Sequence, residues 1–202
     1  MDLSVVTQVS LVSLAFFAGL ISSIAGSGGI LTLPALLWAG LPPLNALATN
    51  KVQSSIGTLS SAWNFFRNGH IDIKPLLPVL LMGFVGSVIG TLSVQQLDSE
   101  ILLTLIPFLL IAIAIYFLLM PKISAADSQP KISQRWFACT AGLGMGFYGG
   151  FFGPAMGSIF PFLLVWLVAR NLVTATAETK LMILVVNGTS AVIFIAGGHV
   201  LW

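Results

Sequence analysis

The chain has 202 residues, of which 57% are hydrophobic and 7% are charged, and its mean hydropathy is +1.03. Because soluble domains carry about 25% charged residues, this composition excludes a soluble protein and indicates a membrane protein. The net charge of +2 and the scattered Lys and Arg residues indicate no nucleic-acid-binding surface. A single cysteine cannot form an intrachain disulfide or a cysteine cluster for a metal. We expect lipid around the protein, no nucleic-acid partner, no metal and no cofactor.

Long apolar runs predict the transmembrane spans. Runs at residues 5–41, 76–97, 101–120 and 136–168 each reach the roughly 20 residues that cross the hydrocarbon, and a shorter run at 181–196 can be completed by its flanks. The first run has no basic n-region of a signal peptide, so we expect it to be retained as a span. Transmembrane β-strands alternate apolar and polar residues, and these runs do not. The predicted fold class is therefore all-α, a polytopic membrane helix bundle.

A polar segment divides the chain. The sequence PKISAADSQPKISQR at residues 121–135 collects Ser, Asp, Gln and Pro where the apolar pattern stops. We expect a first transmembrane repeat at residues 1–120, a polar cytoplasmic linker at 121–135 and a second transmembrane repeat at 136–202. Two runs separate the basic linker from a basic loop at Arg67 and Lys74, which places both loops on the cytoplasmic side. The first run is either one broken span or a span followed by a re-entrant half-helix, so the side of the N-terminus stays open.

The two halves repeat the same glycines and prolines. One constant interval in the sequence separates the members of three pairs: Gly19 and Gly146, Gly26 and Gly153, Pro34 and Pro161. Further along, NALATNK ends at Lys51 and TATAETK ends at Lys180, and the interval between these lysines also separates a GHI motif from a GHV motif. Agreement in this order across both halves predicts an internal duplication.

The second repeat looks incomplete when it is compared with the first. In the first half, the GHI motif is followed by the runs at 76–97 and 101–120, whereas the chain ends soon after GHV. We therefore expect either a truncated second repeat or a variant that completes its bundle by self-association as a homo-oligomer. The sequence leaves both possibilities open.

Glycine and proline interrupt the first apolar run in the stretch AGSGGILTLPALLWAGLPP. Glycine disfavours a helix by about 1 kcal/mol and proline by about 3 kcal/mol, so these residues predict a break, and GFYGGFFGPAMGS at 146–158 predicts an equivalent one. In a membrane, a break persists where protein or a wet cavity satisfies the backbone, and the start of the next half-helix attracts an anion. The alternative is that the glycines only let helices pack closely.

Lys51 and Lys180 occupy equivalent positions in the two halves. A duplicated cation within apolar sequence is a natural ligand for an anion. The alternative is a lysine near a helix end whose ammonium reaches interfacial water and binds nothing. Glu178 is expected to neutralise Lys180 locally, which makes Lys51 the stronger candidate.

The remaining polar residues indicate no enzyme chemistry. The two histidines, His70 and His199, each follow a glycine in a predicted loop, and no pair of carboxylates lies within a span. Such residues form neither a catalytic triad nor a metal site, so we expect a protein that is not an enzyme.

Four motifs, taken in order, resemble the sulfite-exporter TauE/SafE family of bacterial membrane transporters. They are the glycine-rich segment with its proline, NALATNK, GFYGGFFGPAMGS and ATAETK. The resemblance covers the chain from about residue 14 to residue 202. It implies a multi-pass α-helical protein of the bacterial inner membrane that moves small sulfur-containing anions such as sulfite and organosulfonates.

The resemblance also implies substrate-binding positions in both motifs: Gly26, Gly28, Gly29, Pro34, Asn50 and Lys51 in the first, and Gly153, Pro154, Gly157 and Lys180 in the second. The chain departs from the family in two ways. Similar relatives often carry an aspartate where this chain has Ser22 and Gly149, and the final spans are absent. If those acids serve cation or proton coupling, this chain couples differently or acts passively.

The sequence thus predicts an inner-membrane transporter that binds a small anion, a sulfur oxyanion or an organosulfonate, at the repeat interface between broken helices. Two other functions stay open: a non-transporting membrane scaffold or assembly subunit, and a passive anion channel. Flux in proteoliposomes separates them, because a scaffold gives no flux and a channel gives flux that does not saturate.

Overall fold

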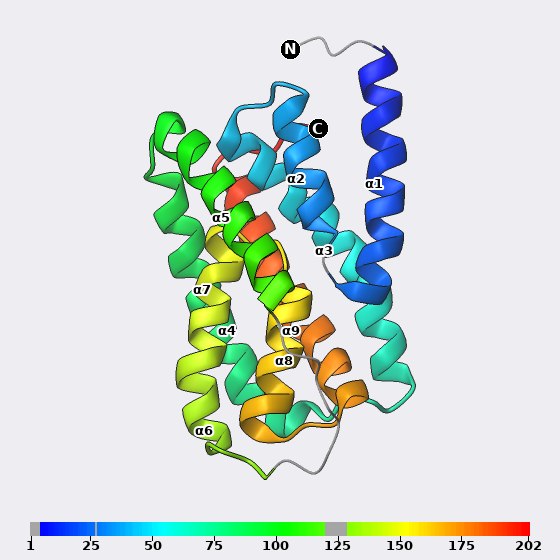
Figure 1. The fold of residues 1–202 in the computed structure, drawn as a ribbon, viewed down its shortest axis with the longest axis vertical. Helices are drawn as coiled ribbons and strands as arrows, with labels where there is room; N and C mark the ends of the chain where they lie inside the picture. Colours follow the sequence, from blue (N-terminus) through cyan, green and yellow to red (C-terminus); the bar gives the residue numbers. More distant parts are fainter. Residues whose placement is uncertain (1–4, 27, 120–128) are drawn as a thin grey trace.

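A computed structural model describes residues 5–26, 28–119 and 129–202. Over these residues the chain is a bundle of helices and contains no strands (Figure 1). The elements follow in the order α1 (Val5–Ala25), α2 (Gly29–Trp38), α3 (Pro43–Arg67), α4 (Ile73–Gln95), α5 (Ser99–Leu119), α6 (Gln134–Phe137), the π-helical turn η1 (Ala138–Gly142), α7 (Leu143–Phe151), α8 (Met156–Val168) and α9 (Leu172–Ala196). The predicted all-α helix bundle is confirmed.

Helices in the described part of the chain match most of the predicted spans. Four are long and apolar enough to cross a membrane: Val5–Ser23, Ile73–Gln95, Ser99–Leu119 and Leu172–Ala196. The last one completes the short run at 181–196 from its N-terminal flank. Most of the predicted linker lies outside the described residues, and α6 begins within its last two positions.

Two of the predicted runs are broken in the middle. One break separates α1 from α2, and the other separates α7 from α8. In Figure 1, α1 descends from the end that carries the N-terminus and α2 returns towards that end, whereas α7 rises from the opposite end and α8 returns to it. The first run is therefore a helix followed by a re-entrant half-helix. Pro34 lies inside α2, as Pro161 lies inside α8, so the prediction that Pro34 helps to break the helix is wrong.

The sequence predicted no span for the region that forms α3. α3 has 25 residues, as α9 does, and the first residues of the two helices are separated by the same interval as Lys51 and Lys180. Each helix is followed by a glycine with a φ of +70°, Gly69 or Gly198. α3 and α9 pack side by side and run in opposite directions through the molecule (Figure 1). These features agree with the predicted duplication, which stays a prediction.

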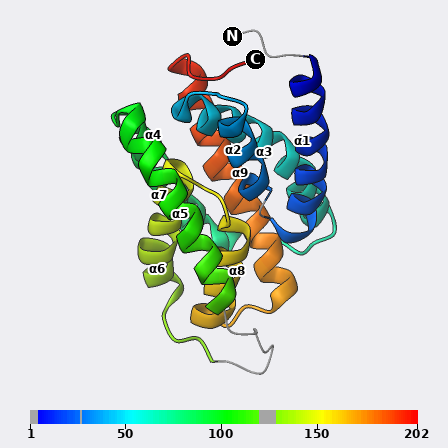
Figure 2. The ribbon, with the colours of Figure 1, turned by 45° about the horizontal axis from the view of Figure 1, so that its top comes forward.

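The helices differ widely in how much of their surface the bundle covers. α1 lies at the outer edge in both ribbon views (Figures 1 and 2). Only 6% of its membrane-spanning window is buried, compared with 44% for α4 and 50% for α9. α4 and α7 approach backbone to backbone, because a Cβ added at Gly86, Gly90, Gly146 or Gly150 would lie within 3.0 Å of a carbonyl oxygen on the other helix.

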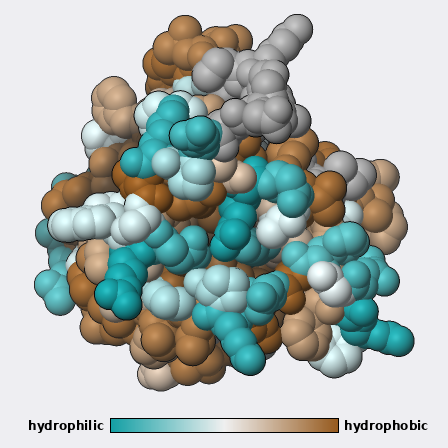
Figure 3. Space-filling view, turned by 90° about the horizontal axis from the view of Figure 1, so that it is seen from below, coloured by the Kyte–Doolittle hydropathy of each residue, from teal (hydrophilic) through white to brown (hydrophobic). Residues whose placement is uncertain are grey.

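Charged side chains collect at one end of the molecule. This end is formed by the α3–α4 connection, the start of α6 and the α8–α9 connection, and hydrophilic residues spread across the middle of its surface (Figure 3). Arg67, Lys74 and Arg135 are exposed there, and Lys131 lies over the ring of Trp166. The two basic loops therefore lie at the same end, as the sequence predicted.

Candidate functional site

The two helix breaks meet near the middle of the bundle. At each break a glycine adopts a left-handed backbone, with a φ of +70° at Gly26 and +102° at Gly153. The backbone of Gly26 lies directly against that of Gly157, because a Cβ added at either residue would lie within 3.0 Å of backbone atoms of the other. A side chain at this contact would force the two halves of the chain apart.

Gly28 and Gly29 lie at the start of α2 and not in the middle of a helix, as the sequence predicted. Gly28 precedes the helix and Gly29 is its first residue. In the second half, Ala155 precedes α8 with a φ of +66° and Met156 is the first helical residue. At these starts the N–H of Leu31 donates to the carbonyl of Gly28, and the N–H of Met156 donates to the carbonyl of Gly153 at 3.3 Å. Both helix starts still direct a positive dipole end towards the break.

A small cavity of about 20 Å³ lies between the two breaks. Both halves contribute to its walls, which consist of Ser22, Gly26, Gly28, Gly29, Asn50, Lys51, Ser54, Thr58, Gly153, Pro154, Ala155, Met156, Ile183 and Asn187. A volume of this size accommodates about one water molecule. The observed arrangement therefore leaves only a small polar space between the breaks.

Lys51 carries the positive charge into this cavity. Its side chain is 1% exposed, and its Nζ donates to the main-chain carbonyl of Gly149 and to Oδ1 of Asn187 at 3.2 Å. Gly153 leaves room for the ammonium, because a Cβ there would lie within 3.0 Å of Lys51 Nζ. An ammonium has three N–H donors, so one remains for a ligand in the cavity. The position is not that of a lysine reaching interfacial water.

Lys180 crosses between the halves in the opposite direction. Its buried side chain donates from Nζ to the main-chain carbonyl of Ser22 at 2.5 Å. Lys51 thus reaches the last turn of α7, and Lys180 reaches the last turn of α1. The accepting residues, Ser22 and Gly149, are the two positions at which the family resemblance implies an aspartate. Each lysine therefore stabilises the carbonyl end of the broken helix in the other half.

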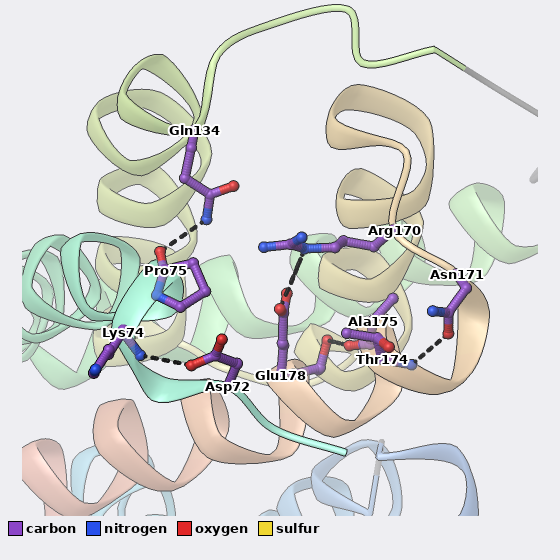
Figure 4. A network of polar contacts seen from close by, with 10 residues as sticks. Asp72, Lys74, Pro75, Gln134, Arg170, Asn171, Thr174, Ala175 and Glu178 are labelled. Carbon is purple, nitrogen blue, oxygen red and sulfur yellow. Dashed lines mark hydrogen bonds and ion pairs between the residues drawn. The ribbon is translucent and has the colours of Figure 1, made fainter. Parts of the chain in front are cut away.

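Neither lysine has a carboxylate partner among the described residues. The ion pair found there joins Arg170 Nε to Glu178 Oε1 at 3.2 Å. Figure 4 shows this pair at the charged end of the molecule, near Asp72. The expectation that Glu178 neutralises Lys180 is therefore wrong, because Glu178 turns towards the α8–α9 connection and Lys180 turns towards α1.

Asn50 connects the cavity to the start of α2. The hydroxyl of Thr32 donates to Asn50 Oδ1 at 2.5 Å, and both side chains are buried. The Nδ2 atom of Asn50 lies beside Gly29, since a Cβ added at Gly29 would be 3.3 Å from it. The asparagine amide thus faces the first turn of the half-helix.

The structure brings together seven of the ten predicted site residues. Gly26, Gly28, Gly29, Asn50, Lys51, Gly153 and Pro154 line the cavity. Gly157 and Lys180 lie at its edge, against Gly26 and Ser22 respectively, whereas Pro34 lies farther along α2. Their roles in binding stay predictions.

Sequence reasoning missed two further side chains on each long helix that share the face of the lysine. Ser54 and Thr58 follow Lys51 on α3, and Ile183 and Asn187 follow Lys180 on α9. Positions three and seven residues after a helical residue lie on its own face. A search of the positions three and seven residues after each lysine would have found these residues.

The described residues contain no group of three or more His, Cys, Asp or Glu side chains that could hold a metal ion. His70 and His199 lie at the ends of α3 and α9, away from the residues that line the cavity. The polar chemistry of the cavity therefore comes from an ammonium, two amides, hydroxyls and main-chain groups.

Comparison with known proteins gives the family. The family model described as "Sulfite exporter TauE/SafE" matches residues 11–202. The chain is 45% identical over 188 residues to the "Probable membrane transporter protein YfcA" of Escherichia coli (strain K12), covering 93% of this chain and 70% of that protein. It is 39% identical over 202 residues to a "Probable membrane transporter protein" of Haemophilus influenzae, covering the whole chain and 79% of that protein.

A third relative, the "Probable membrane transporter protein ORF9" of Sinorhizobium sp, is 42% identical over 188 residues, which cover 93% of this chain and 72% of that protein. No solved structure matches the chain. The family match extends over both helix breaks and both buried lysines. The chain belongs to the sulfite exporter TauE/SafE family and is a multi-pass membrane transporter.

Proposed function

We propose that the transported substrate is a small anion, a sulfur oxyanion or an organosulfonate, and that it binds between the two broken helices. The observation that carries this proposal is the ammonium of Lys51, which is buried at the cavity without a carboxylate partner among the described residues. The sulfur chemistry is suggested by the family description alone.

The electrostatics of the cavity favour an anion over a cation. Placing a lysine within the hydrocarbon costs about 2.5–3.5 kcal/mol on insertion scales, and an anion beside Lys51 would offset part of that cost. The starts of α2 and α8 both border the cavity, at Gly29 and Met156. Each helix start adds a favourable interaction with negative charge of roughly 0.3–1 kcal/mol.

The small cavity also implies a movement during transport. Its volume of about 20 Å³ holds about one water molecule, so the site must widen when a larger anion enters. The helix breaks lie at the contact between the two halves, where a shift of one half would open the cavity to one side of the membrane.

The test compares lysines inside and outside the cavity. Lys51→Ala should weaken anion binding about tenfold or more, because it removes a charge-assisted hydrogen bond, and Lys180→Ala should weaken it less. Lys74→Ala is the control, since Lys74 is exposed in the first turn of α4. The measurements are thermal stabilisation by sulfite, thiosulfate and small sulfonates, and uptake of the same anions into proteoliposomes.

Each outcome separates one function from the others. Lys51→Arg should rescue binding only in part, because a planar guanidinium does not reproduce a compact ammonium. Equal behaviour of Lys51→Ala and Lys74→Ala for every bound anion would place the site elsewhere. Binding without flux would favour a scaffold, and flux without saturation would favour a passive channel.

A further inference from the structure

Asn187 borders the cavity from the second half of the chain, and its amide orientation follows from its neighbour. Lys51 Nζ approaches Asn187 Oδ1 at 3.2 Å. An ammonium can only donate hydrogen bonds, so the amide must turn its oxygen towards Lys51. The NH₂ group of Asn187 is therefore directed away from the lysine.

The NH₂ group has no protein acceptor among the described residues. The Asn187 side chain is 8% exposed and lines the cavity. Among the described residues, the hydroxyl of Tyr116 is the side-chain polar atom that is both fully enclosed and without a hydrogen-bond partner. Nδ2 of Asn187 is not fully enclosed, so it reaches open space. A largely buried donor without an acceptor costs free energy unless a ligand or water satisfies it.

The equivalent position in the first half offers no such donor. Thr58 is separated from Asn187 by the same interval as Lys51 from Lys180, and it also lines the cavity. Its hydroxyl already donates to the main-chain carbonyl of Ser54 at 2.7 Å. The two halves therefore present different chemistry at matching positions, with the free N–H donors on α9.

We propose that Asn187 is a specificity-determining residue whose NH₂ group donates to an oxygen of the transported anion, while Lys51 holds the amide in the orientation that makes this possible. This inference rests on the proposed function and adds to it. Lys51 supplies charge, which attracts any anion, whereas an amide supplies directed N–H groups that match the oxygen atoms of an oxyanion. Asn187 thereby favours anions that carry oxygen acceptors.

The first experiment replaces Asn187 with a side chain of similar size that cannot donate. Asn187→Leu should weaken binding of sulfite, thiosulfate and small sulfonates about tenfold, because the donor to a charged acceptor is lost. Asn64→Leu is the matched control, since Asn64 is exposed near the end of α3. If Asn187→Leu does not fold, Asn187→Ala is measured in its place, with the same expectation.

The second experiment separates donation to the anion from support of Lys51. In protein labelled with ¹⁵N on asparagine, the side-chain NH₂ signals that vanish in the Asn187 variant identify Asn187. These signals should shift when a saturating anion is added to the wild-type protein. An anion acceptor should move the NH₂ proton signals downfield. Unchanged NH₂ signals would mean that the amide does not donate to the anion, and that result overturns the inference.

The outcomes also distinguish this inference from the proposed function. If the wild-type protein binds none of the anions, both fail. If Lys51→Ala weakens binding but Asn187→Leu stays within about twofold of wild type, the anion site stands and the role of Asn187 is refuted. A tenfold loss together with an anion-dependent shift of the Asn187 signals supports both.

Discussion

The two hairpins of broken helices, α1–α2 and α7–α8, have the same local structure at the break but differ in how they are packed. Each has a left-handed glycine at its break and contributes the start of a half-helix to the cavity. α7 is enclosed by α4 and α9, and the hydroxyl of Thr91 on α4 donates to the carbonyl of Gly150 at 3.2 Å. α1 has most of its surface uncovered by the bundle.

The comparison shows that the break in a helix and the rigidity of the broken segment have separate origins. The break follows from local glycines, whereas rigidity follows from packing against neighbouring helices. α1–α2 is joined to the second half by the contact of Gly26 with Gly157 and by the hydrogen bond from Lys180 to Ser22. We expect α1–α2 to move during transport while α7–α8 stays fixed against α4.

The largest expected effect is a loss of stability when a side chain is added on α7, the enclosed helix, and not when one is added on α1. Gly146→Ala should destabilise the protein by about 3 kcal/mol, because its Cβ would lie within 3.0 Å of the backbone of Gly83 on α4. Gly19→Ala is the matched variant at the equivalent position of the first half, where a Cβ meets nothing within 4 Å. It should leave stability unchanged or raise it by up to about 1 kcal/mol.

Thermal unfolding in detergent or in lipid measures both glycine variants. A clear loss for Gly146→Ala with none for Gly19→Ala supports the difference between the hairpins. Equal losses would mean that the outer face of α1 is packed as closely as that of α7.

A smaller effect separates the two left-handed glycines. Gly153→Ala should cost about 1–2 kcal/mol of stability, because alanine disfavours a positive φ. Gly26→Ala should cost at least as much, because its Cβ would also lie within 3.0 Å of the backbone of Gly157. Gly153→Ala should in addition weaken anion binding several-fold, since its Cβ would displace the ammonium of Lys51. Gly26→Ala touches Gly157 and not a lysine, so the anion affinity of its folded fraction should change less. Equal losses of affinity, measured by titration, would contradict this assignment.

Local signals predicted the helix breaks, and tertiary contacts account for what was missed. Glycine propensity and the internal pattern were enough to place Gly28 and Gly29 at the start of a helix. They were not enough for α3, because its polar residues lower the hydropathy of a helix whose polar face is covered by protein. A helix that lines a polar site thus escapes a search for apolar runs.

The sequence predicted only part of the site, because the contacts that complete it are tertiary. Lys51 stands out in an apolar sequence, but its partners Gly149 and Asn187 come from helices far along the chain. Glu178 lies two residues from Lys180 in sequence, but helical residues two positions apart point in different directions. The carboxylate of Glu178 pairs with Arg170 instead. Proximity in sequence was the wrong guide there, and helical spacing would have been the better one.

The most direct test of the anion site is protection of a cysteine placed in the cavity. Ser54→Cys, made in a Cys139→Ser background, puts a thiol on the cavity wall, and Ser60→Cys puts one on the exposed part of the same helix. The rate of alkylation by iodoacetamide is measured with and without a saturating small sulfonate that stabilises the protein. If the anion binds in this cavity, alkylation should be slower at residue 54 and unchanged at residue 60. Equal rates at residue 54 with and without the bound anion would contradict binding in this cavity.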